Sequence, residues 1–283
     1  RNFIINKKGE IFMKKNILKI VAAGVLALSV VGCSNKASAG SDENIIKIGV
    51  SPVPHKEIVE QIKPDLEAKG YTVEIIEFTD YVTPNTALAE GDIDANYFQH
   101  ISYLDETNSS KNLDLTYTAR IHLEPIAVYS KVATSLKDIK EGGTIAIPND
   151  PANEARALKL LEKEGLITVE DGELITINEI VENPKNLKFE ELDAAQLPRI
   201  LEEVDAAVIN GNYALEAGLS PVKDSLAIED KDAEASTVYQ NILAVKSGNE
   251  DVQKIKDLTE ALTSEKVKTY INEKYEGAVV PAF

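Results

Sequence analysis

Cysteine, tryptophan and basic residues are scarce in this chain of 283 residues. It has one cysteine, Cys33, and no tryptophan, and its 30 Lys and Arg residues face 47 Asp and Glu residues, which gives a net charge of −17. A single cysteine forms no disulfide within the chain, so hydrophobic cores must supply the stability. Contacts to nucleic-acid phosphates need a basic surface, and we therefore expect no nucleic-acid partner.

Motifs of catalysis and phosphate binding are also missing. The sequence has no G-x-S-x-G nucleophile motif, no G-x-x-x-x-G-K-[ST] and no G-x-G-x-x-G. No cysteine is available as a nucleophile if Cys33 is modified. These absences favour a binding protein over an enzyme, and they give no reason to expect a cofactor.

Residues 13–33 resemble a lipoprotein signal that ends in the chain's cysteine. Three lysines precede an apolar run at 20–31, which has the length of a signal peptide and is short for a membrane span. The following residues resemble a lipobox, in which the cysteine sulfur is lipidated and becomes the new N-terminus. The alternatives are a transmembrane anchor or an ordinary buried cysteine. We expect a signal peptide at 13–32 and a lipid on Cys33 that holds the protein at the extracytoplasmic face of the cell membrane.

The segments on either side of this signal have other expected roles. Residues 1–12 precede Met13, the only methionine, and Lys8-Gly9-Glu10 can be encoded by a purine run typical of a ribosome-binding site. We therefore expect residues 1–12 to be untranslated leader read in frame. Residues 34–44 are small and polar without an apolar period, so residues 33–44 are predicted to form a lipidated, flexible tether.

From residue 45 onward, strand patterns alternate with helix patterns. Strands are predicted at 45–51, 71–78, 93–97, 144–148, 187–192 and 206–210. Helices are predicted at 56–69, 83–90, 151–163 and 253–274, the third with Asp150 as N-cap and Pro151 at its first position. Such alternation predicts an α/β fold with mostly parallel sheet.

Two extended apolar segments, 123–131 and 238–246, are bounded by polar sequence and lie far apart in the chain. A pair of such segments suggests that one lobe is inserted into another. Lobe one would hold residues 45–123 and 247–283, lobe two residues 131–236, and the crossover strands residues 124–130 and 237–246. The alternative is that both segments are strands of one larger sheet.

The three histidines are candidate metal ligands. His55, His100 and His122 together with a carboxylate could hold Zn²⁺ or Mn²⁺, since imidazole is a common ligand. Their spacing has no local signature such as H-x-x-x-H, so structural or ligand-contacting roles are the alternative. A metal-binding lipoprotein of an importer is therefore the second hypothesis for this chain.

Two segments combine the side chains that a small-molecule pocket needs. Residues 93–103 gather aromatic rings, amides and His100, which suit a ligand with an apolar and a polar end. At 149–156, Asn153 and Arg156 share one face of a helix whose N-terminus favours anions. Arg156 offers a two-pronged partner for a carboxylate. The alternative for Arg156 is an exposed side chain paired with a glutamate of its own helix.

A set of short motifs resembles the NlpA lipoprotein family, the methionine-binding lipoproteins of ABC importers. The resemblance runs in order from the lipobox to the C-terminus. Its motifs are Glu77-Phe78-Thr79-Asp80-Tyr81, Pro84-Asn85, Asp94-Ala95-Asn96, Phe98-Gln99-His100, Tyr103-Leu104, Glu124-Pro125-Ile126, Pro148-Asn149-Asp150-Pro151, Arg156, the segment 181–187, Gln196-Leu197-Pro198-Arg199 and Ala207-Val208-Ile209-Asn210.

This resemblance implies a two-lobed periplasmic-binding-protein fold with two crossover strands and a ligand, L-methionine or a close relative, in the cleft between the lobes. Tyr81, Phe98 and Tyr103 would flank the thioether side chain, and Arg156 would bind the α-carboxylate. The remaining site residues, at the polar end, would be His100, Asn149, Asn153, Asn210 and Asn241. Tyr97 and Ser102 depart from the usual family residues, and we expect them to alter the apolar end of the pocket.

The resemblance also implies partners. The closed, ligand-bound form of a monomer would dock on a membrane permease driven by a cytoplasmic ATPase. D-methionine, methionine-containing dipeptides and other amino acids are alternative ligands. A lipid-anchored hydrolase and a surface adhesin are further alternatives, the second of which is compatible with transport.

Overall fold

The computed structural model describes residues 43–232 and 234–283. The predicted leader at 1–12, the signal peptide at 13–32, and Cys33 with most of the tether lie outside the described residues. None of the helices in the described part has the length and apolar character that crossing a membrane requires.

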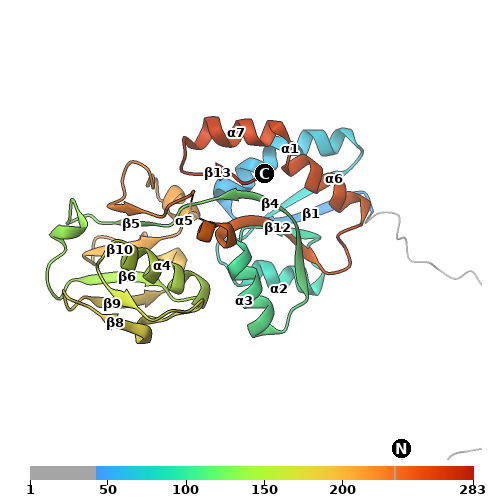
Figure 1. Cartoon of the computed structure of the whole chain (residues 1–283). Coiled ribbons are helices and arrows are strands. Elements are labelled where there is room, and N and C mark those ends of the chain that lie inside the picture. The colour runs from blue at the N-terminus through green and yellow to red at the C-terminus, as the bar shows by residue number, and fades with distance from the viewer. Residues whose placement is uncertain (1–42, 233) are drawn as a thin grey trace, which may run out of the picture. The chain divides into compact units, whose positions relative to one another are not determined.

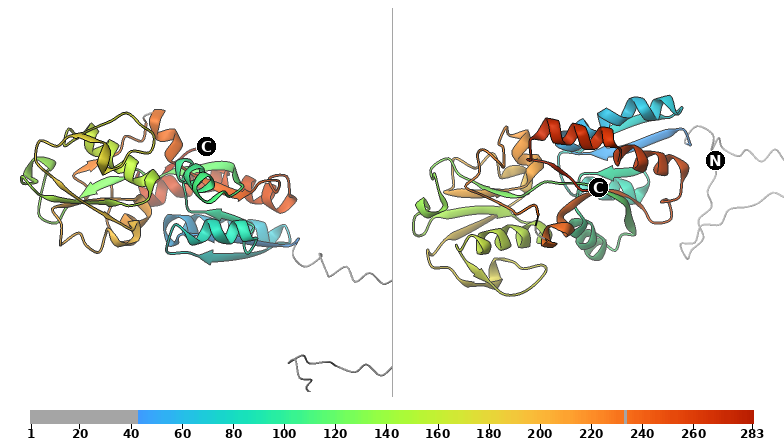
Figure 2. Two further views of the ribbon diagram at one scale, coloured as in Figure 1. Left: turned by 90° about the horizontal axis from the view of Figure 1, so that it is seen from below. Right: turned by 45° about the horizontal axis from the view of Figure 1, so that its top comes forward.

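The strands form two larger sheets that stand apart in Figure 1 and in both views of Figure 2. The six-stranded sheet has the order β13-β4-β12-β3-β1-β2. Its strands are β1 (Ile45–Val50), β2 (Thr72–Glu77), β3 (Ala95–Tyr97), β4 (Leu115–Leu123), β12 (Gln240–Lys246) and β13 (Val280–Pro281).

The five-stranded sheet has the order β11-β5-β10-β6-β9. Its strands are β5 (Ala127–Tyr129), β6 (Thr144–Pro148), β9 (Lys188–Leu192), β10 (Ala206–Ile209) and β11 (Ala227–Ile228), and β7 (Thr168–Val169) pairs separately with β8 (Ile180–Glu182).

Helices lie on the faces of these sheets (Figure 1). The α-helices are α1 (Glu57–Ala68), α2 (Thr83–Glu90), α3 (Ile101–Lys111), α4 (Pro151–Lys163), α5 (Gly211–Glu216), α6 (Gln253–Leu262) and α7 (Glu265–Tyr275). Short turns are π-helical at Pro52–Lys56 and 3-10 at Leu136–Asp138, Ile177–Glu179, Ala194–Gln196 and Glu234–Tyr239. We call the six-stranded sheet with α1–α3, α6 and α7 the first half, and the five-stranded sheet with α4 and α5 the second half.

Each half has its own hydrophobic core. In the first half, the apolar faces of α1, α6 and α7 pack on one side of the sheet through Ile58, Leu258 and Ile271, all 0% exposed. Helices α2 and α3 pack on the other side through a smaller cluster around Leu88 and Leu104. The second half buries α4 on its sheet in the same way. Separate cores allow each half to keep its own rigid arrangement.

The predicted strand and helix segments are largely confirmed. The segments 83–90, 144–148 and 151–163 match α2, β6 and α4 at both ends. Asp150 is the N-cap of α4, because its side chain accepts a hydrogen bond from the backbone N–H of Asn153 at 2.9 Å. Such a cap satisfies one of the free N–H groups at the start of a helix.

The prediction of a mostly parallel sheet is only partly correct. Strand β1 is parallel to β2 and β3, and β6 is parallel to β9 and β10. Strands β4, β5, β11, β12 and β13 instead make antiparallel pairs. The reason is the path of the chain, since β12 returns to the six-stranded sheet beside β4, the strand by which the chain left it.

The chain crosses twice between the sheets. Residues 124–126 link β4 to β5, and the 3-10 turn Glu234–Tyr239 leads back into β12. The alternative in which both crossover segments belong to one larger sheet is therefore wrong. Most of the second predicted crossover is itself a strand of the first half, because β12 pairs with β4 from Gln240 opposite Leu123 to Lys246 opposite Leu115.

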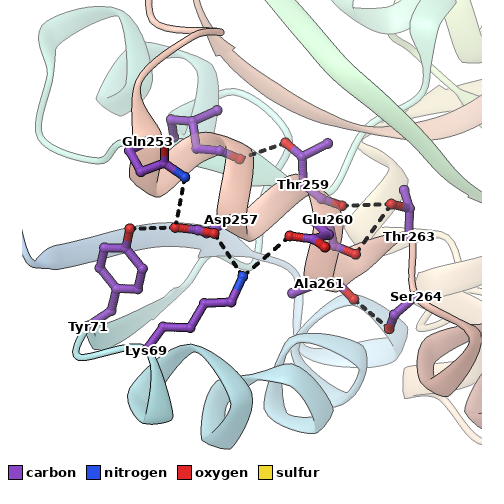
Figure 3. A network of polar contacts seen from close by, with 10 residues as sticks. Lys69, Tyr71, Gln253, Asp257, Thr259, Glu260, Ala261, Thr263 and Ser264 are labelled. Atoms are coloured by element: carbon purple, nitrogen blue, oxygen red, sulfur yellow. Dashed lines mark hydrogen bonds and ion pairs between the residues drawn. The ribbon is translucent and has the colours of Figure 1, made fainter.

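The single long helix predicted at 253–274 is wrong, because the chain breaks between α6 and α7. Figure 3 shows the hydroxyl of Thr263 bonded to the backbone oxygen of Thr259 and that of Ser264 bonded to the oxygen of Ala261, at 2.9 and 2.7 Å. Ser264 has an extended backbone and acts as the N-cap of α7. Side-chain hydroxyls that bond to nearby backbone groups compete with helix continuation, which explains the break.

Candidate ligand-binding site

A cavity between the two halves is lined by residues of both. It lies at the carboxyl ends of parallel strands, where α/β folds generally bind ligands. Tyr81 follows β2, Phe98 follows β3, and Asn210 follows β10. The full lining is Tyr81, Phe98, Gln99, His100, Tyr103, Glu124, Asn153, Arg156, Asn210, Gly211, Asn212 and Asn241.

Three aromatic rings form one wall of the cavity. The ring centroid of Tyr81 lies 6.0 Å from that of Phe98 and 5.7 Å from that of Tyr103, and Phe98 and Tyr103 are 6.1 Å apart. The hydroxyl of Tyr103 donates to the backbone oxygen of Tyr81 at 3.0 Å, which fixes the two side chains relative to each other. The centroid separations are those of edge-to-face and offset aromatic pairs. This wall is rigid and apolar.

Behind the aromatic wall lies a buried amide network of the first half. The side chains of Asn85 and Gln99 exchange hydrogen bonds at 2.8 and 2.7 Å, and Asn96 donates to Asn85 and accepts from Gln99. All three are at most 3% exposed. A fully satisfied buried network holds its members in one arrangement. It therefore positions Phe98 and His100, which flank Gln99.

His100 starts a polar chain that reaches from the first half into the second. Its Nδ1 accepts a hydrogen bond from the backbone N–H of Tyr103 at 3.1 Å, so the ring proton is on Nε2. Nε2 then donates to Oδ1 of Asn153 at 3.1 Å, and the same oxygen accepts from Nδ2 of Asn210 at 2.7 Å. Burial, with a further effect of the Arg156 charge, lowers the pKa of His100 to about 3. The ring is therefore neutral at physiological pH.

Arg156 is buried on the opposite side of this polar region. Its Nε and Nη2 atoms donate to the two carboxylate oxygens of Glu229 at 2.9 and 2.5 Å, and Nη2 also donates to the backbone oxygen of Glu124 at 2.8 Å. The ring of Tyr239 lies 4.4 Å from the guanidinium carbon. With 3% exposure, Arg156 is not the exposed residue of the alternative interpretation. The contacts named here leave Nη1 available to a ligand.

The three histidines do not form the predicted metal set. Among the described residues, the group able to hold a metal ion consists of His55, His122 and Glu124, all buried, and His100 bonds to Asn153 instead. The separation has a structural cause, because the rings of His55 and His122 pack against each other and against Tyr97, whereas His100 is the N-cap of α3. The set of His55, His100 and His122 is therefore wrong.

Eight of the nine predicted ligand-binding residues line the cavity, and Asn149 does not. Asn149 is exposed, and its backbone N–H continues the β6–β9 pairing by donating to Leu192 at 2.9 Å. Its contact with a ligand stays a prediction. Tyr97 does not line the cavity either, because its ring is fully buried and its hydroxyl bonds to Nδ1 of His122.

Four lining residues have no predicted role: Gln99, Glu124, Gly211 and Asn212. Gln99 and Glu124 stand in the short motifs Phe98-Gln99-His100 and Glu124-Pro125-Ile126, and this was the available signal. Gly211 and Asn212 follow Asn210 directly at the start of α5. The partner of Arg156, Glu229, is far away in the sequence, and no local pattern marks it.

Several hydrogen bonds join the halves across the cavity. The hydroxyl of Tyr81 donates to Oδ1 of Asn212 at 2.5 Å, and that of Tyr213 donates to the backbone oxygen of Thr79 at 3.1 Å. With the pair of His100 and Asn153, they connect the two sides directly. The described arrangement is thus one in which both halves line the cavity and are bonded to each other across it.

Comparison with known proteins gives this geometry its context. Residues 46–283 match the NlpA lipoprotein family. The chain belongs to this family. The chain is 41% identical over 270 residues to the methionine-binding lipoprotein MetQ of Bacillus subtilis (strain 168), covering 93% of this chain and 96% of that protein. It is 40% identical over 265 residues to the D-methionine-binding lipoprotein MetQ of Escherichia coli (strain K12), covering 92% and 95%.

A solved structure of the same kind has a closely similar fold. It is a nutrient-binding protein from Burkholderia cenocepacia bound to methionine, with a TM-score of 0.80 and 43% identity over 84% of this chain and all of that one. The periplasmic-binding-protein fold expected from the sequence is thereby confirmed. As a member of the NlpA lipoprotein family, the chain is a substrate-binding protein and not an enzyme.

The histidines provide a test of the site's electrostatics. Burial lowers the pKa of His55 to about 4 and those of His100 and His122 to about 3. We expect imidazole NMR signals of the folded protein to stay those of neutral rings from pH 8 to pH 5, while the urea-unfolded chain titrates near 6.5. Because the unfolded state then binds more protons, the histidine contribution to stability decreases as the pH falls below about 6.5. Protonation of His100 near pH 6 in the folded protein would contradict its assigned hydrogen bonds.

Proposed function

We propose that this protein captures L-methionine, or a close relative, in the cavity between its two halves and delivers it to the permease and ATPase of an ABC importer. The observation that carries the proposal is the cavity itself, whose lining combines three aromatic rings with Arg156 and several amides. The names of the relatives, a methionine-binding and a D-methionine-binding lipoprotein, agree with it.

The aromatic wall suits the thioether end of methionine. Tyr81, Phe98 and Tyr103 offer ring faces and edges, and a sulfur contact with an aromatic ring is worth about 0.3–1.5 kcal/mol. Phe98 and Tyr103 are 3% and 6% exposed, so a ligand side chain between the rings would be almost fully removed from water. Burial of a methionine side chain contributes about 1.5–3 kcal/mol.

The polar region suits the α-carboxylate and its neighbours. Arg156 presents Nη1 to a ligand while Glu229 holds the rest of the guanidinium. The buried Oδ1 of Asn210 has no hydrogen-bond partner among the described residues. A buried polar atom without a partner is costly, so a ligand that bonds to it gains affinity. Asn241, at the start of β12, also faces this region.

The position of the site between the halves supports a closing mechanism. Tyr81, Phe98 and His100 come from the first half, and Asn153, Arg156 and Asn210 come from the second. A ligand that contacts both sets is bound more tightly by the closed form than by an open one. It therefore shifts the population towards the closed form, which would be the form that docks on the permease.

The cellular setting is part of the same proposal. Relatives named as lipoproteins place such proteins at a membrane surface, and Cys33 is our candidate for the lipid attachment. We propose a monomer tethered by residues 33–44 at the extracytoplasmic face of the cell membrane. Radiolabelled palmitate incorporation that disappears in Cys33→Ala would test the anchor.

Native mass spectrometry and calorimetry test the ligand. We expect the purified protein to carry a bound mass equal to methionine, and the stripped protein to bind L-methionine with submicromolar affinity. D-methionine, glycylmethionine and norleucine measured alongside would rank the alternatives. A protein that is empty and ignores all four compounds would contradict the proposal, whereas stoichiometric Zn or Mn in the same preparation would favour the metal-importer alternative.

A further inference from the structure

A buried carboxylate, that of Glu124, faces the polar side of the cavity. Glu124 follows β4 directly, is 5% exposed, and lines the cavity with Arg156 and Asn210. Gly211 makes room for it, because a Cβ at residue 211 would lie 2.6 Å from Cβ of Glu124 and 2.8 Å from its Oε2. The chain thus keeps a glycine where any larger residue would displace this carboxylate.

His122 forms a hydrogen bond with Glu124, and His55 lies close to the same carboxylate oxygen. Nε2 of His122 lies 2.7 Å from Oε1 of Glu124, and Nε2 of His55 lies 3.3 Å from the same oxygen. Because an ionised carboxylate can only accept, the ring proton of His122 is on Nε2, and the other ring nitrogen then accepts from the hydroxyl of Tyr97. His55 also contacts Oδ1 of Asn241 at 3.0 Å through Nε2. His122 therefore offers its N–H group to the carboxylate, whereas Nε2 of His55 lies within reach of both Glu124 and Asn241.

Neutral N–H donors stabilise the ionised carboxylate, but they carry no positive charge that would balance it. Burial lowers the pKa of His55 to about 4 and that of His122 to about 3, so both rings are neutral. Burial also raises the pKa of Glu124, while the backbone N–H of Asn212 and the nearby Arg156 act in the opposite direction. The charge of Arg156 is already paired with both oxygens of Glu229.

Glu124 therefore has no cation of its own among the described residues that line the cavity. Among the described residues that line it, Glu124 is the one carboxylate and Arg156 the one cation, and Arg156 is shared with Glu229 outside the lining. A buried carboxylate without a matched cation is costly, and a ligand that brings a cation removes that cost. An α-amino acid carries an ammonium group one carbon away from the carboxylate that Arg156 would bind.

We propose that Glu124 accepts the α-ammonium group of the ligand, and that His55 and His122 are positioning residues that hold this carboxylate towards the cavity. The inference rests on the proposed function and adds a specificity determinant to it. Glu124 then selects zwitterionic amino acids over carboxylic acids that have the same side chain but no amino group.

The test compares two ligands that differ only in the amino group, L-methionine and 4-(methylsulfanyl)butanoate. By calorimetry on the purified chain, we expect the wild type to prefer methionine by about 100-fold or more. Glu124→Gln should lose most of the affinity for methionine and change that for 4-(methylsulfanyl)butanoate by less than about threefold, so the preference collapses. Glu154→Gln, a buried glutamate on α4 outside the cavity lining, should keep the preference.

Each outcome separates the inference from the proposed function. A wild type that binds both compounds equally overturns the inference, and this measurement needs no variant to fold. Equal losses for both compounds in Glu124→Gln also overturn it, because that pattern is expected of a structural role alone. A wild type that binds neither compound overturns the proposed function itself. His122→Phe removes an N–H donor from Glu124. It should weaken the binding of methionine more than the binding of 4-(methylsulfanyl)butanoate, so the preference for methionine decreases.

Discussion

Replacing Arg156 with alanine is expected to lower the affinity for methionine by about 30- to 700-fold, which corresponds to about 2–4 kcal/mol. The substitution removes the guanidinium and leaves the ligand carboxylate buried without a partner. It also frees Glu229, whose side chain is 13% exposed and bonded to Arg156 through both oxygens. The unpaired negative charge of Glu229 near the cavity further weakens binding of the ligand carboxylate.

Two matched variants separate these effects. Arg156→Lys keeps the charge but loses the planar two-pronged contact, so we expect an intermediate loss. Glu229→Gln keeps Arg156 and removes the competing carboxylate, so we expect methionine affinity to change by less than about threefold. Calorimetry measures all three variants, with urea unfolding to confirm that each is folded. A loss below tenfold in Arg156→Ala would count against the carboxylate-binding role.

Replacing Phe98 with alanine is expected to lower the affinity for methionine by about 10- to 100-fold. Phe98 is 3% exposed and packs with Tyr81, Tyr103 and Ala152, a residue of α4, so its loss opens the aromatic wall. The lost energy combines apolar burial of the ligand side chain with the contact between sulfur and the ring. Part of the wall remains, because Tyr103 is held by its bond to Tyr81.

Norleucine distinguishes the two contributions, since it has a methylene in place of the sulfur. Phe98→Leu should restore much of the affinity for norleucine but less of that for methionine. Phe189→Ala is the control, because Phe189 packs in the core of the second half and does not line the cavity. It should lower the free energy of unfolding without changing the affinity. Unchanged methionine binding by Phe98→Ala would show that the ligand side chain lies elsewhere.

The local sequence indicated several of the helices and strands and the residue types of the site, but it gave no sign of α3 or α5. Polar–apolar periodicity, with Gly and Pro residues near the segment ends, was enough to predict α2, β6 and α4. Their predicted bounds agree with the structure at both ends. Neighbouring residues in the chain were enough to mark two parts of the site as candidates. These are the aromatic and amide residues after β3 and Arg156 near the start of α4. These are short-range properties, which local pattern can express.

The sequence could not determine which distant residues meet. The bond of Arg156 to Glu229 joins residues 73 positions apart, and that of His55 to Asn241 joins residues 186 apart. Packing between distant segments also separates His55 and His122 from His100 and brings β12 back antiparallel to β4. The break at Ser264 is different, because local side-chain bonds account for it.

The physical reason for this division is the range of the interactions. Helix caps and periodic burial act over a few residues, so they can be identified before the chain is folded. The charge balance around Glu124 depends on the pairing of Arg156 with Glu229 and on histidines that face the core, and the chain brings these groups together only by crossing twice between its sheets. The sequence by itself therefore indicated, through its resemblance to the NlpA lipoprotein family, the kind of ligand to expect, and the tertiary structure decided which of the candidate side chains line the cavity.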